Sequence, residues 1–325
     1  MKRILIIQTS TISNVVLTTP LIEKIAQHFP ETKIDFLVNQ GNQEILMGHP
    51  KLNQLYVWKR FTNKYKNLIR LILIFRKKNY DIVINTQRNF VSGLITVLSK
   101  GKILRGFSKN PFSIFFDKKV IYRINGSHET SRNLALINDL TDKKYVAPKL
   151  YPRSSDIAAI AKFQEFPYVC IAPISNWGTK QFPQVKWIEL ILSFNDNWII
   201  YLLGSKDDYE ECEEIRLHTE RKNINNLAGK LSILASAALM AKAKMNYVNE
   251  TAPLHLASAL NAPINVVYCS TVPHFGFGPL SIHSKIIESE LDLPCRPCGL
   301  HGKHECPLGH FDCAHSIDIN KFDKP

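Results

Sequence analysis

The stretch Asn249–Leu260, NETAPLHLASAL, decides how the rest of the chain is interpreted. It lies between two apolar, strand-like runs, 245–248 and 264–269, and its leucines and alanines recur at helical spacing. Strand, polar turn, helix and strand form a βαβ unit, with Glu250 and Thr251 beside the helix N-terminus. Free backbone N–H groups and the positive end of the helix dipole meet there, which suits an anionic ligand. A capped helix, with Asn or Thr as N-cap and Pro253 just inside, explains the same residues.

Short apolar runs alternate with helical patterns along the whole chain, which predicts parallel sheets covered by helices on both faces. The stretch 141–155 mixes Asp, Lys, Pro and Ser without apolar periodicity, so we place the domain boundary there and expect domains 1–150 and 151–325. A chain of 325 residues is long enough for two cores. Strands are predicted over 2–8, 33–38, 55–58, 80–85, 168–174 and 198–203, and helices over 15–29, 65–78, 187–194, 207–221 and 231–242.

The positive charge is concentrated in the first half. Residues 1–150 carry 25 Lys+Arg against 9 Asp+Glu, a balance of +16, whereas residues 151–325 carry 16 against 19, a balance of −3. Nucleic acid, an anionic lipid surface, an acidic glycan or simply a solvated basic surface would each explain this. The basic half has no Arg-rich tail, aromatic RNA-binding signature or zinc-finger spacing, so nucleic acid is the weakest alternative.

The N-terminus has only four consecutive apolar residues, Ile4–Ile7, and no apolar run approaches the ~18 residues of a membrane span. We therefore expect a cytoplasmic protein that could still touch a membrane surface.

Several separate motifs resemble glycosyltransferase family 9, the heptosyltransferases. They are 8–20 (QTSTISNVVLTTP), 85–88 (NTQR), 128–134 (HETSRNL), 175–183 (SNWGTKQFP), 249–260 and 270–279 (STVPHFGFGP). The resemblance covers nearly the whole chain. It implies a GT-B fold, in which two Rossmann-like doubly wound domains face across a cleft. It also implies inverting transfer of a heptose-like sugar, from a nucleotide diphosphate donor such as ADP-heptose, to a lipopolysaccharide core acceptor. Such an anionic glycolipid would place the enzyme at the cytoplasmic face of the inner membrane.

The resemblance also assigns residue roles. Donor binding is expected at Ser175, Asn176, Thr179, Lys180, Asp208, Glu250, Thr251, Ala252, Pro253 and His255. Hydroxyls, backbone amides and one ammonium group suit a diphosphate, and the loop around Lys180 supplies all three. An acid after the strand 198–203, Asp208 or Asp207, could hold ribose hydroxyls, although an acid at a helix start is equally ordinary. We expect Trp177 and Trp187 to be packing residues rather than ligands.

The first loop departs from the family pattern. Ser13-Asn14 stands where relatives carry Gly-Asp, and the resemblance makes that Asp the general base on the acceptor hydroxyl. Asn14 can position a hydroxyl by hydrogen bonding but cannot take its proton. Ser13, Asn14, Arg88 and Arg132 are the expected acceptor-binding residues, and Asn14 and Lys180 the catalytic ones. A non-catalytic relative that binds a sugar nucleotide or glycan is the alternative. We also expect Ser13 to be costly if the loop needs positive φ.

Seven cysteines fall into two groups. Cys170, Cys212 and Cys269 stand singly, and Cys170 and Cys269 lie in apolar runs, where buried free thiols are expected. Four more form the pattern C-x2-C-x7-C-x6-C, which could bind a structural zinc ion or remain as thiols or disulfides. These four are Cys295, Cys298, Cys306 and Cys313. No catalytic metal or other cofactor is expected, because an ammonium group, hydroxyls and a helix dipole can stabilise a leaving diphosphate.

Overall fold

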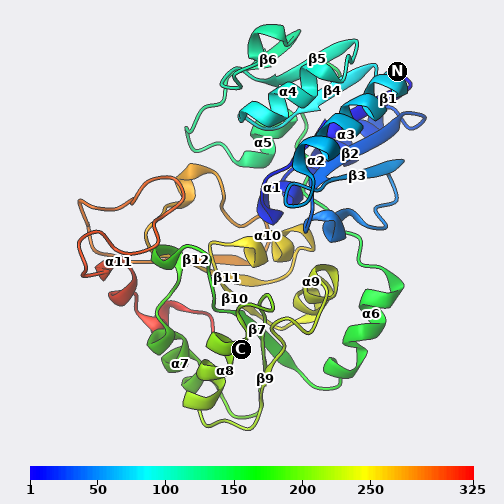
Figure 1. The fold of residues 1–325 in the computed structure, drawn as a ribbon. Coiled ribbons are helices and arrows are strands. Elements are labelled where there is room, and N and C mark those ends of the chain that lie inside the picture. Colours follow the sequence, from blue (N-terminus) through cyan, green and yellow to red (C-terminus); the bar gives the residue numbers. More distant parts are fainter. The chain divides into compact units, whose positions relative to one another are not determined.

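The structure is a computed structural model that describes residues 1–325. Its contacts divide the chain into two compact units, Met1–Tyr151 (unit 1) and Pro152–Pro325 (unit 2). Each unit contains one parallel six-stranded sheet with helices around it (Figure 1). No helix has the length and apolar character that a membrane crossing requires.

Unit 1 has the strand order β3-β2-β1-β4-β5-β6, with every pair parallel. Its strands are β1 (Arg3–Ile7), β2 (Lys33–Asn39), β3 (Gln54–Trp58), β4 (Ile82–Asn85), β5 (Ile103–Phe107) and β6 (Lys118–Val120). Its helices are α1 (Ile12–Val16), α2 (Thr19–His28), α3 (Lys64–Lys78), α4 (Phe90–Leu98) and α5 (Glu129–Leu134), with 3₁₀ turns η1 (Gln43–Leu46) and η2 (Ser113–Phe115).

Unit 2 repeats this order as β12-β11-β10-β7-β8-β9, again all parallel. Its strands are β7 (Tyr168–Ala172), β8 (Ile199–Leu202), β9 (Ile224–Asn226), β10 (Asn246–Asn249), β11 (Ile264–Tyr268) and β12 (Ser284–Glu288). Its helices are α6 (Ser154–Ile160), α7 (Gln184–Leu192), α8 (Tyr209–His218), α9 (Ile233–Lys242), α10 (Ala252–Ala259) and α11 (Asp312–His315), with 3₁₀ turns η3 (Ala161–Phe163), η4 (Gly178–Lys180), η5 (Pro273–Phe275) and η6 (Ile319–Lys321).

Both sheets therefore have the doubly wound, Rossmann-like order predicted from the sequence. In such a sheet the first three strands are added towards one edge and the last three towards the other, so the strand order reverses between the first and fourth strands. Ligands bind at the carboxyl ends of the strands at that point. The reversal lies between β1 and β4 in unit 1 and between β7 and β10 in unit 2.

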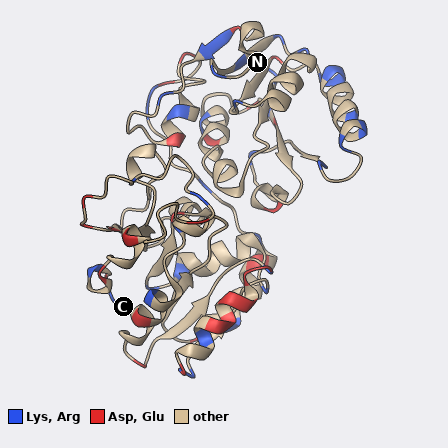
Figure 2. Ribbon diagram, turned by 60° about the vertical axis from the view of Figure 1, so that its left-hand side comes forward, with Lys and Arg blue, Asp and Glu red and all other residues tan.

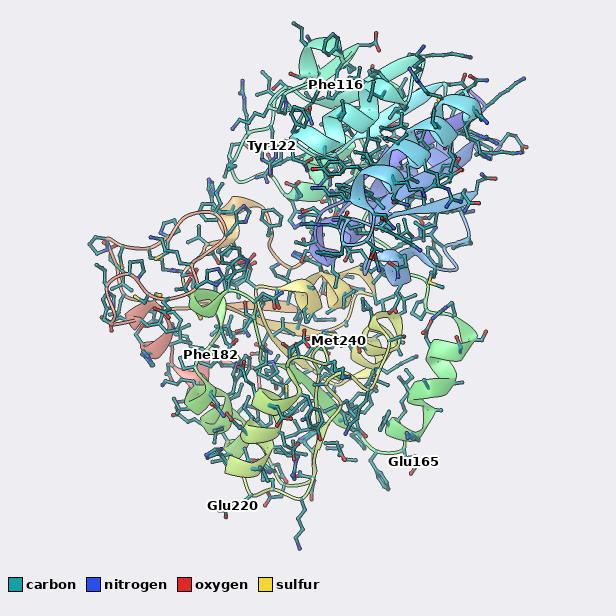
Figure 3. All side chains as sticks on the ribbon, in the orientation of Figure 1. Phe116, Tyr122, Glu165, Phe182, Glu220 and Met240 are labelled. Atoms are coloured by element: carbon teal, nitrogen blue, oxygen red, sulfur yellow. The ribbon has the colours of Figure 1, made fainter.

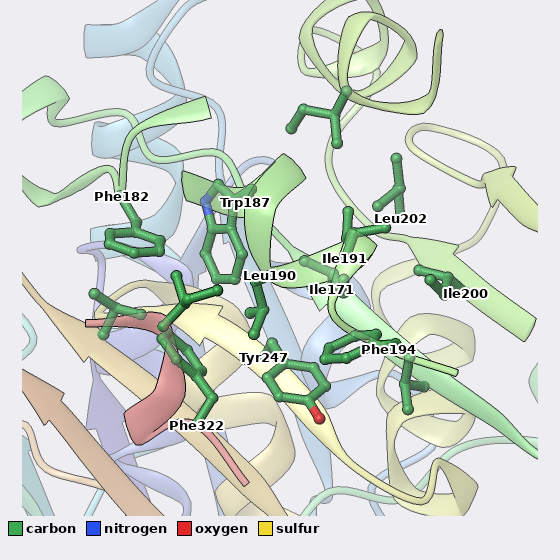
Figure 4. Packing of buried hydrophobic residues seen from close by; sticks show 14 of the residues in the cluster. Ile171, Phe182, Trp187, Leu190, Ile191, Phe194, Ile200, Leu202, Tyr247 and Phe322 are labelled. Atoms are coloured by element: carbon green, nitrogen blue, oxygen red, sulfur yellow. The ribbon is translucent and has the colours of Figure 1, made fainter. Parts of the chain in front are cut away.

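Alternation along the central strands fills both faces of each sheet. In unit 2, Val169 and Ile171 pack on one face, whereas Tyr168, Cys170 and Ala172 pack on the other. Side chains fill the interior of both units, as Figure 3 shows. Trp187, predicted to be a packing residue, is fully buried beside Phe182 and Phe322 in the first of these clusters (Figure 4).

One prediction about local structure is wrong. The helix predicted over 15–29 is two helices, α1 and α2, with Thr18 between them and Pro20 in the first turn of α2. Pro20 lacks a backbone N–H and therefore suits a helix start better than a helix interior. Trp177, also expected to be a packing residue, is 38% exposed, and its ring lies against the His304 ring, with ring centroids 5.0 Å apart.

The basic and acidic residues can be followed in Figure 2. Helix α3 carries Arg76, Lys77 and Lys78 in its last turn, where cations complement the helix dipole. Helix α8 begins with Glu210 and Glu211, which complement the opposite end.

Candidate functional site

The carboxyl ends of β7 and β10 bring two predicted residues of opposite charge together. Lys180 closes the 3₁₀ turn η4 after β7, and Glu250 directly follows β10. Lys180 Nζ forms an ion pair with Glu250 Oε2, and each side chain is 9% exposed. Since β7 and β10 flank the point where the strand order reverses, this pair marks the position where ligands bind in doubly wound sheets.

A hydroxyl from a third strand completes the pair. Thr271, three residues beyond the end of β11, donates a hydrogen bond from Oγ1 to Glu250 Oε2 at 2.7 Å. The buried carboxylate thus receives both an ammonium group and a hydroxyl, which offset the cost of removing it from water. Chemically, the cluster offers a cation for phosphate and a carboxylate for sugar hydroxyls.

A second layer of hydrogen bonds holds the loop of Lys180. Ser270 Oγ donates to Thr179 Oγ1 at 2.9 Å, and the backbone N–H of Lys303 donates to the same oxygen at 2.8 Å. The Thr179 N–H in turn donates to the Lys303 carbonyl at 3.0 Å. The chain near Lys303 packs so closely that a Cβ on Gly302, whose φ is +73°, would lie 3.0 Å from Thr179 Oγ1. Thr179 therefore positions its neighbour, Lys180, through a segment more than 120 residues away.

The segment that returns to the donor loop is anchored by Arg296 and Cys298. Arg296 donates to the carbonyls of Cys269 at 2.7 Å and Thr271 at 2.9 Å, and to the Glu288 carboxylate at 2.6 Å. The Cys298 N–H donates to the Ser270 carbonyl at 2.8 Å. Arg296 was not among the predicted residues, and Cys298 was predicted only as a possible zinc ligand.

The N-terminus of α10 lies directly after Glu250. Thr251 occupies the N-cap position, but its side chain makes no capping hydrogen bond to the first turn. The expected side-chain cap is thus absent, and the Thr251 side chain does not cap the backbone N–H groups of Ala252 and Leu254 in the first turn. Pro253 has no backbone N–H group. This arrangement agrees with an anion-binding helix start.

Four other predicted donor residues lie apart from the ion pair. The Ser175 hydroxyl bonds to the backbone of Trp177, and Asn176 is exposed on the same loop. Asp208 follows β8, and its carboxylate accepts a hydrogen bond from the Ser205 N–H at 2.6 Å. His255 is 2% exposed inside α10, with its ring 6.3 Å from that of Phe277. The donor contacts of these four side chains stay predictions.

Neutral polar side chains bridge the strand ends at the corresponding edge of unit 1. After β1, Gln8 Nε2 donates to Thr86 Oγ1 at 2.9 Å, and Thr9 Oγ1 donates to Gln87 Oε1 at 2.6 Å. These bonds join the ends of β1 and β4 across the reversal point. They hold the loop that leads into α1, where Asn14 lies.

Asn14 and Ser13 lie in the first turns of α1. The Asn14 amide donates to Thr11 Oγ1 at 3.0 Å and to Ser10 Oγ at 3.2 Å. Ser13 has helical backbone geometry and is not among the residues with positive φ. The expectation that a Cβ at Ser13 strains the loop is therefore wrong, because a helical φ suits any L-residue.

The two predicted acceptor arginines flank one tyrosine. The Arg88 guanidinium lies 3.6 Å from the ring centroid of Tyr122 and is exposed. Arg132 is 6% exposed, pairs with Glu129 at 3.0 Å and donates to the Tyr122 hydroxyl at 3.2 Å. Burial, with the Glu129 charge, raises the pKa of Tyr122, labelled in Figure 3, to about 12. Arg88 faces solvent and can meet an acceptor, whereas Arg132 belongs to a buried network.

The four clustered cysteines are free thiols. Cys295 Sγ lies 3.9 Å from His310 Nε2, and Cys313 is buried. No group of three or more His, Cys, Asp or Glu side chains is arranged to hold a metal ion. Cys170 and Cys269 are buried as predicted, and burial raises the pKa of the Cys269 thiol well above its usual range.

Comparison with known proteins agrees with this geometry. Residues 68–308 match the sequence profile of glycosyltransferase family 9 (heptosyltransferase). Lipopolysaccharide heptosyltransferase 3 of Escherichia coli strain K12 is 28% identical over 79% of this chain and 80% of that protein. Two solved E. coli structures have the same fold. ADP-heptose LPS heptosyltransferase II has a TM-score of 0.77 and 22% identity, over 89% of this chain and 90% of that one. Heptosyltransferase WaaC with ADP has a TM-score of 0.74 and 21% identity, over 87% of this chain and 92% of that one.

Two doubly wound, Rossmann-like units define a protein of the GT-B fold class. This chain belongs to glycosyltransferase family 9, the heptosyltransferases. The relatives do not favour the non-catalytic alternative.

Proposed function

We propose that this protein transfers a heptose from ADP-heptose to the core of lipopolysaccharide, with inversion at the anomeric carbon. The observation that carries the proposal is the buried Lys180–Glu250 pair beside the N-terminus of α10. The relatives named above as lipopolysaccharide and ADP-heptose enzymes support the choice of sugar and acceptor.

In this proposal unit 2 binds the donor. The Lys180 ammonium and the first-turn N–H groups of α10 would stabilise the negative charge that develops on the leaving diphosphate. Glu250, already hydrogen-bonded by Thr271, would accept hydrogen bonds from sugar hydroxyls. Ser175, Asn176, Asp208 and His255 are the further proposed donor contacts. The ring of His255 is 2% exposed, so neighbouring side chains would have to shift before it met a ligand.

Unit 1 would bind the acceptor, with Asn14 and Arg88 as the contacting residues. Asn14 already donates both hydrogen bonds of its amide group, and its carbonyl oxygen would accept a hydrogen bond from the attacking hydroxyl. An amide cannot hold the departing proton near neutral pH, so water or an acceptor phosphate would take it. Arg88 would pair with a phosphate or carboxylate of the glycolipid.

We further propose that the enzyme works in the cytoplasm against the inner membrane, where its acceptor would be held. The excess of 16 positive charges on residues 1–150 supports contact with an anionic surface.

The test is direct. The protein is incubated with ADP-heptose and with lipopolysaccharide whose core lacks heptose, and released ADP is measured alongside the mass of the glycan. We expect ADP release only when the acceptor is present, with a gain of one heptose per glycan. Equal ADP release without acceptor, or no release with any heptose-deficient core, would remove the proposed reaction.

A separate proposal concerns the four clustered cysteines, which we propose bind a structural zinc ion. Their number and spacing, and the approach of His310 to Cys295, support it; the side chains would have to converge further than they do here. The metal content of the protein, purified without chelator, is measured by plasma mass spectrometry. Cys298→Ser is the test variant, and Cys212→Ser, which replaces a buried cysteine outside the cluster, is the control. One zinc per chain, lost only in Cys298→Ser, is expected; absence of metal in the wild type contradicts the proposal.

A further inference from the structure

Helix α3 of unit 1 has an apolar side that the fold does not use. Four of its residues pack into the core of the unit, namely Leu68, Leu71, Ile72 and Phe75. Beyond this buried side, Tyr65, Ile69 and Leu73 recur every four residues and are 72%, 58% and 51% exposed. Phe61, four residues before Tyr65, is 78% exposed. A surface helix normally keeps its exposed side polar, so a second, solvent-facing apolar stripe calls for a partner.

Cations border this stripe on its outer side. At 100° per residue, Tyr65, Ile69 and Leu73 lie within an arc of about 80°, and Lys66, Arg70 and Lys77 fill the next arc, from about 100° to 140°. All three cations are exposed. The order around the helix is therefore core residues, apolar stripe and then a basic row.

The basic residues here have no carboxylate partners. The stretch 59–78 contains eight Lys and Arg and no Asp or Glu. None of the eight takes part in an ion pair with an acidic residue of the chain, although Arg60 and Lys64 lie over the rings of Phe61 and Tyr65. A helix whose exposed side contacts only water usually carries charges of both signs, which form ion pairs between residues four positions apart.

We propose that the stripe Phe61, Tyr65, Ile69 and Leu73, with the basic row Lys66, Arg70 and Lys77, docks unit 1 on an anionic lipid bilayer. Aromatic and aliphatic side chains would enter the boundary between headgroups and acyl chains, and the cations would contact lipid phosphates. Charge decides in favour of lipid: a nucleic acid would meet the cations but leave the apolar stripe in water. A second copy of the chain would set two uncompensated basic rows against each other.

This inference rests on the proposed function in one respect, namely that the acceptor is held in a membrane. It adds which surface of the protein contacts the lipid. Its test uses neither donor nor acceptor. A failure of vesicle binding is therefore distinguishable from a failure of sugar transfer.

The full-length protein is sedimented with vesicles of phosphatidylcholine alone or mixed with phosphatidylglycerol, at low and high salt. We expect binding to the mixed vesicles that weakens with salt. The double variant Lys66→Gln, Arg70→Gln should weaken binding to the mixed vesicles about 30-fold, because it removes two cations that each attract the anionic leaflet. Ile69→Ser with Leu73→Ser should weaken it roughly 10- to 30-fold through lost apolar burial.

A matched control lies in unit 2. Leu192 and Leu217 are 54% and 57% exposed, and Leu192→Ser with Leu217→Ser should leave vesicle binding unchanged. Circular dichroism and thermal unfolding would verify that each variant is folded.

Equal binding of the wild type to neutral and anionic vesicles, or equal binding by the wild type and both α3 variants, overturns the proposal. So does a shift from dimer to monomer in the Ile69→Ser, Leu73→Ser variant with vesicle binding retained, because the stripe would then be a subunit interface.

Discussion

Replacing Lys180 by Met tests the buried ion pair and the donor site with one set of proteins. Both side chains of the pair are 9% exposed, so Lys180→Met leaves the Glu250 carboxylate buried without its cation. Removing one member of a buried pair costs about 3–5 kcal/mol, because the remaining charge stays out of water. We expect the lower value, about 3 kcal/mol, because Thr271 still donates to Glu250 at 2.7 Å.

The double variant Lys180→Met, Glu250→Gln separates pairing from packing. With both charges removed, most of the lost stability should return, giving a coupling free energy of about 2 kcal/mol between the two positions. Urea unfolding followed by tryptophan fluorescence suits the measurement, because three of the four tryptophans, Trp177, Trp187 and Trp198, lie in unit 2.

The same proteins report on the ligand. Loss of the ammonium group should weaken ADP binding by about 10- to 150-fold, which corresponds to about 1.5–3 kcal/mol for a hydrogen bond to a charged group. Glu250→Gln alone should bind ADP at least as tightly as the wild type, since it releases Lys180 from its partner. Additive stability effects would refute the ion pair, and unchanged ADP affinity by calorimetry in Lys180→Met would remove the diphosphate from this loop.

Three further outcomes follow from the described contacts. Asn14→Asp should raise the rate of ADP release by roughly 10²–10⁴-fold if a missing general base limits turnover. Adding Ser13→Gly should bring no further gain, because Ser13 already has helical backbone geometry. An unchanged rate of ADP release in Asn14→Asp would place the general base elsewhere. Arg132→Met should destabilise the protein by about 3 kcal/mol, because the buried Glu129 loses its cation and keeps only the hydrogen bond from the Tyr122 hydroxyl at 2.6 Å. Intact stability with weakened acceptor binding would indicate a ligand contact instead. The hydrogen bonds from Arg153, against the opposing effect of burial, lower the pKa of Asp156 to about 2 from an ordinary 3.8. Its contribution to stability is therefore complete above about pH 4 and is lost as the pH falls towards 2, and Asp156→Asn should flatten the acid limb of the unfolding free energy measured against pH.

The parallel strands were predictable because they are short, continuous apolar runs, and their alternation with helices predicts parallel sheets. The order of the strands within each sheet emerges only from the structure. The break between α1 and α2 was missed because Val15–Phe29 keeps helical periodicity across it, and only Pro20 marks the new helix start. Short, half-polar strands such as β6 and β9 carry too weak a pattern to be predicted.

The donor site was predictable in its residues but not in its pairing. Lys180 and Glu250 each follow a strand and were both chosen, but they are 70 positions apart, and only the strand order brings them together. Conversely, Arg132 lies in a motif of the family and was assigned to a ligand. Its burial depends on Glu129 and Tyr122, whose contacts appear only in three dimensions.

The hydrogen bonds between Thr179 and Lys303 make the Cys-rich segment and the donor loop parts of one equilibrium. Linkage is reciprocal: any event that fixes the segment, whether metal binding or thiol oxidation, must change donor affinity by the same factor by which the donor changes that event. Bound nucleotide should therefore slow amide hydrogen exchange at Lys303, which contributes its backbone rather than its side chain to this coupling. The redox or metal status of the cell could in this way set how much enzyme is ready to accept a donor.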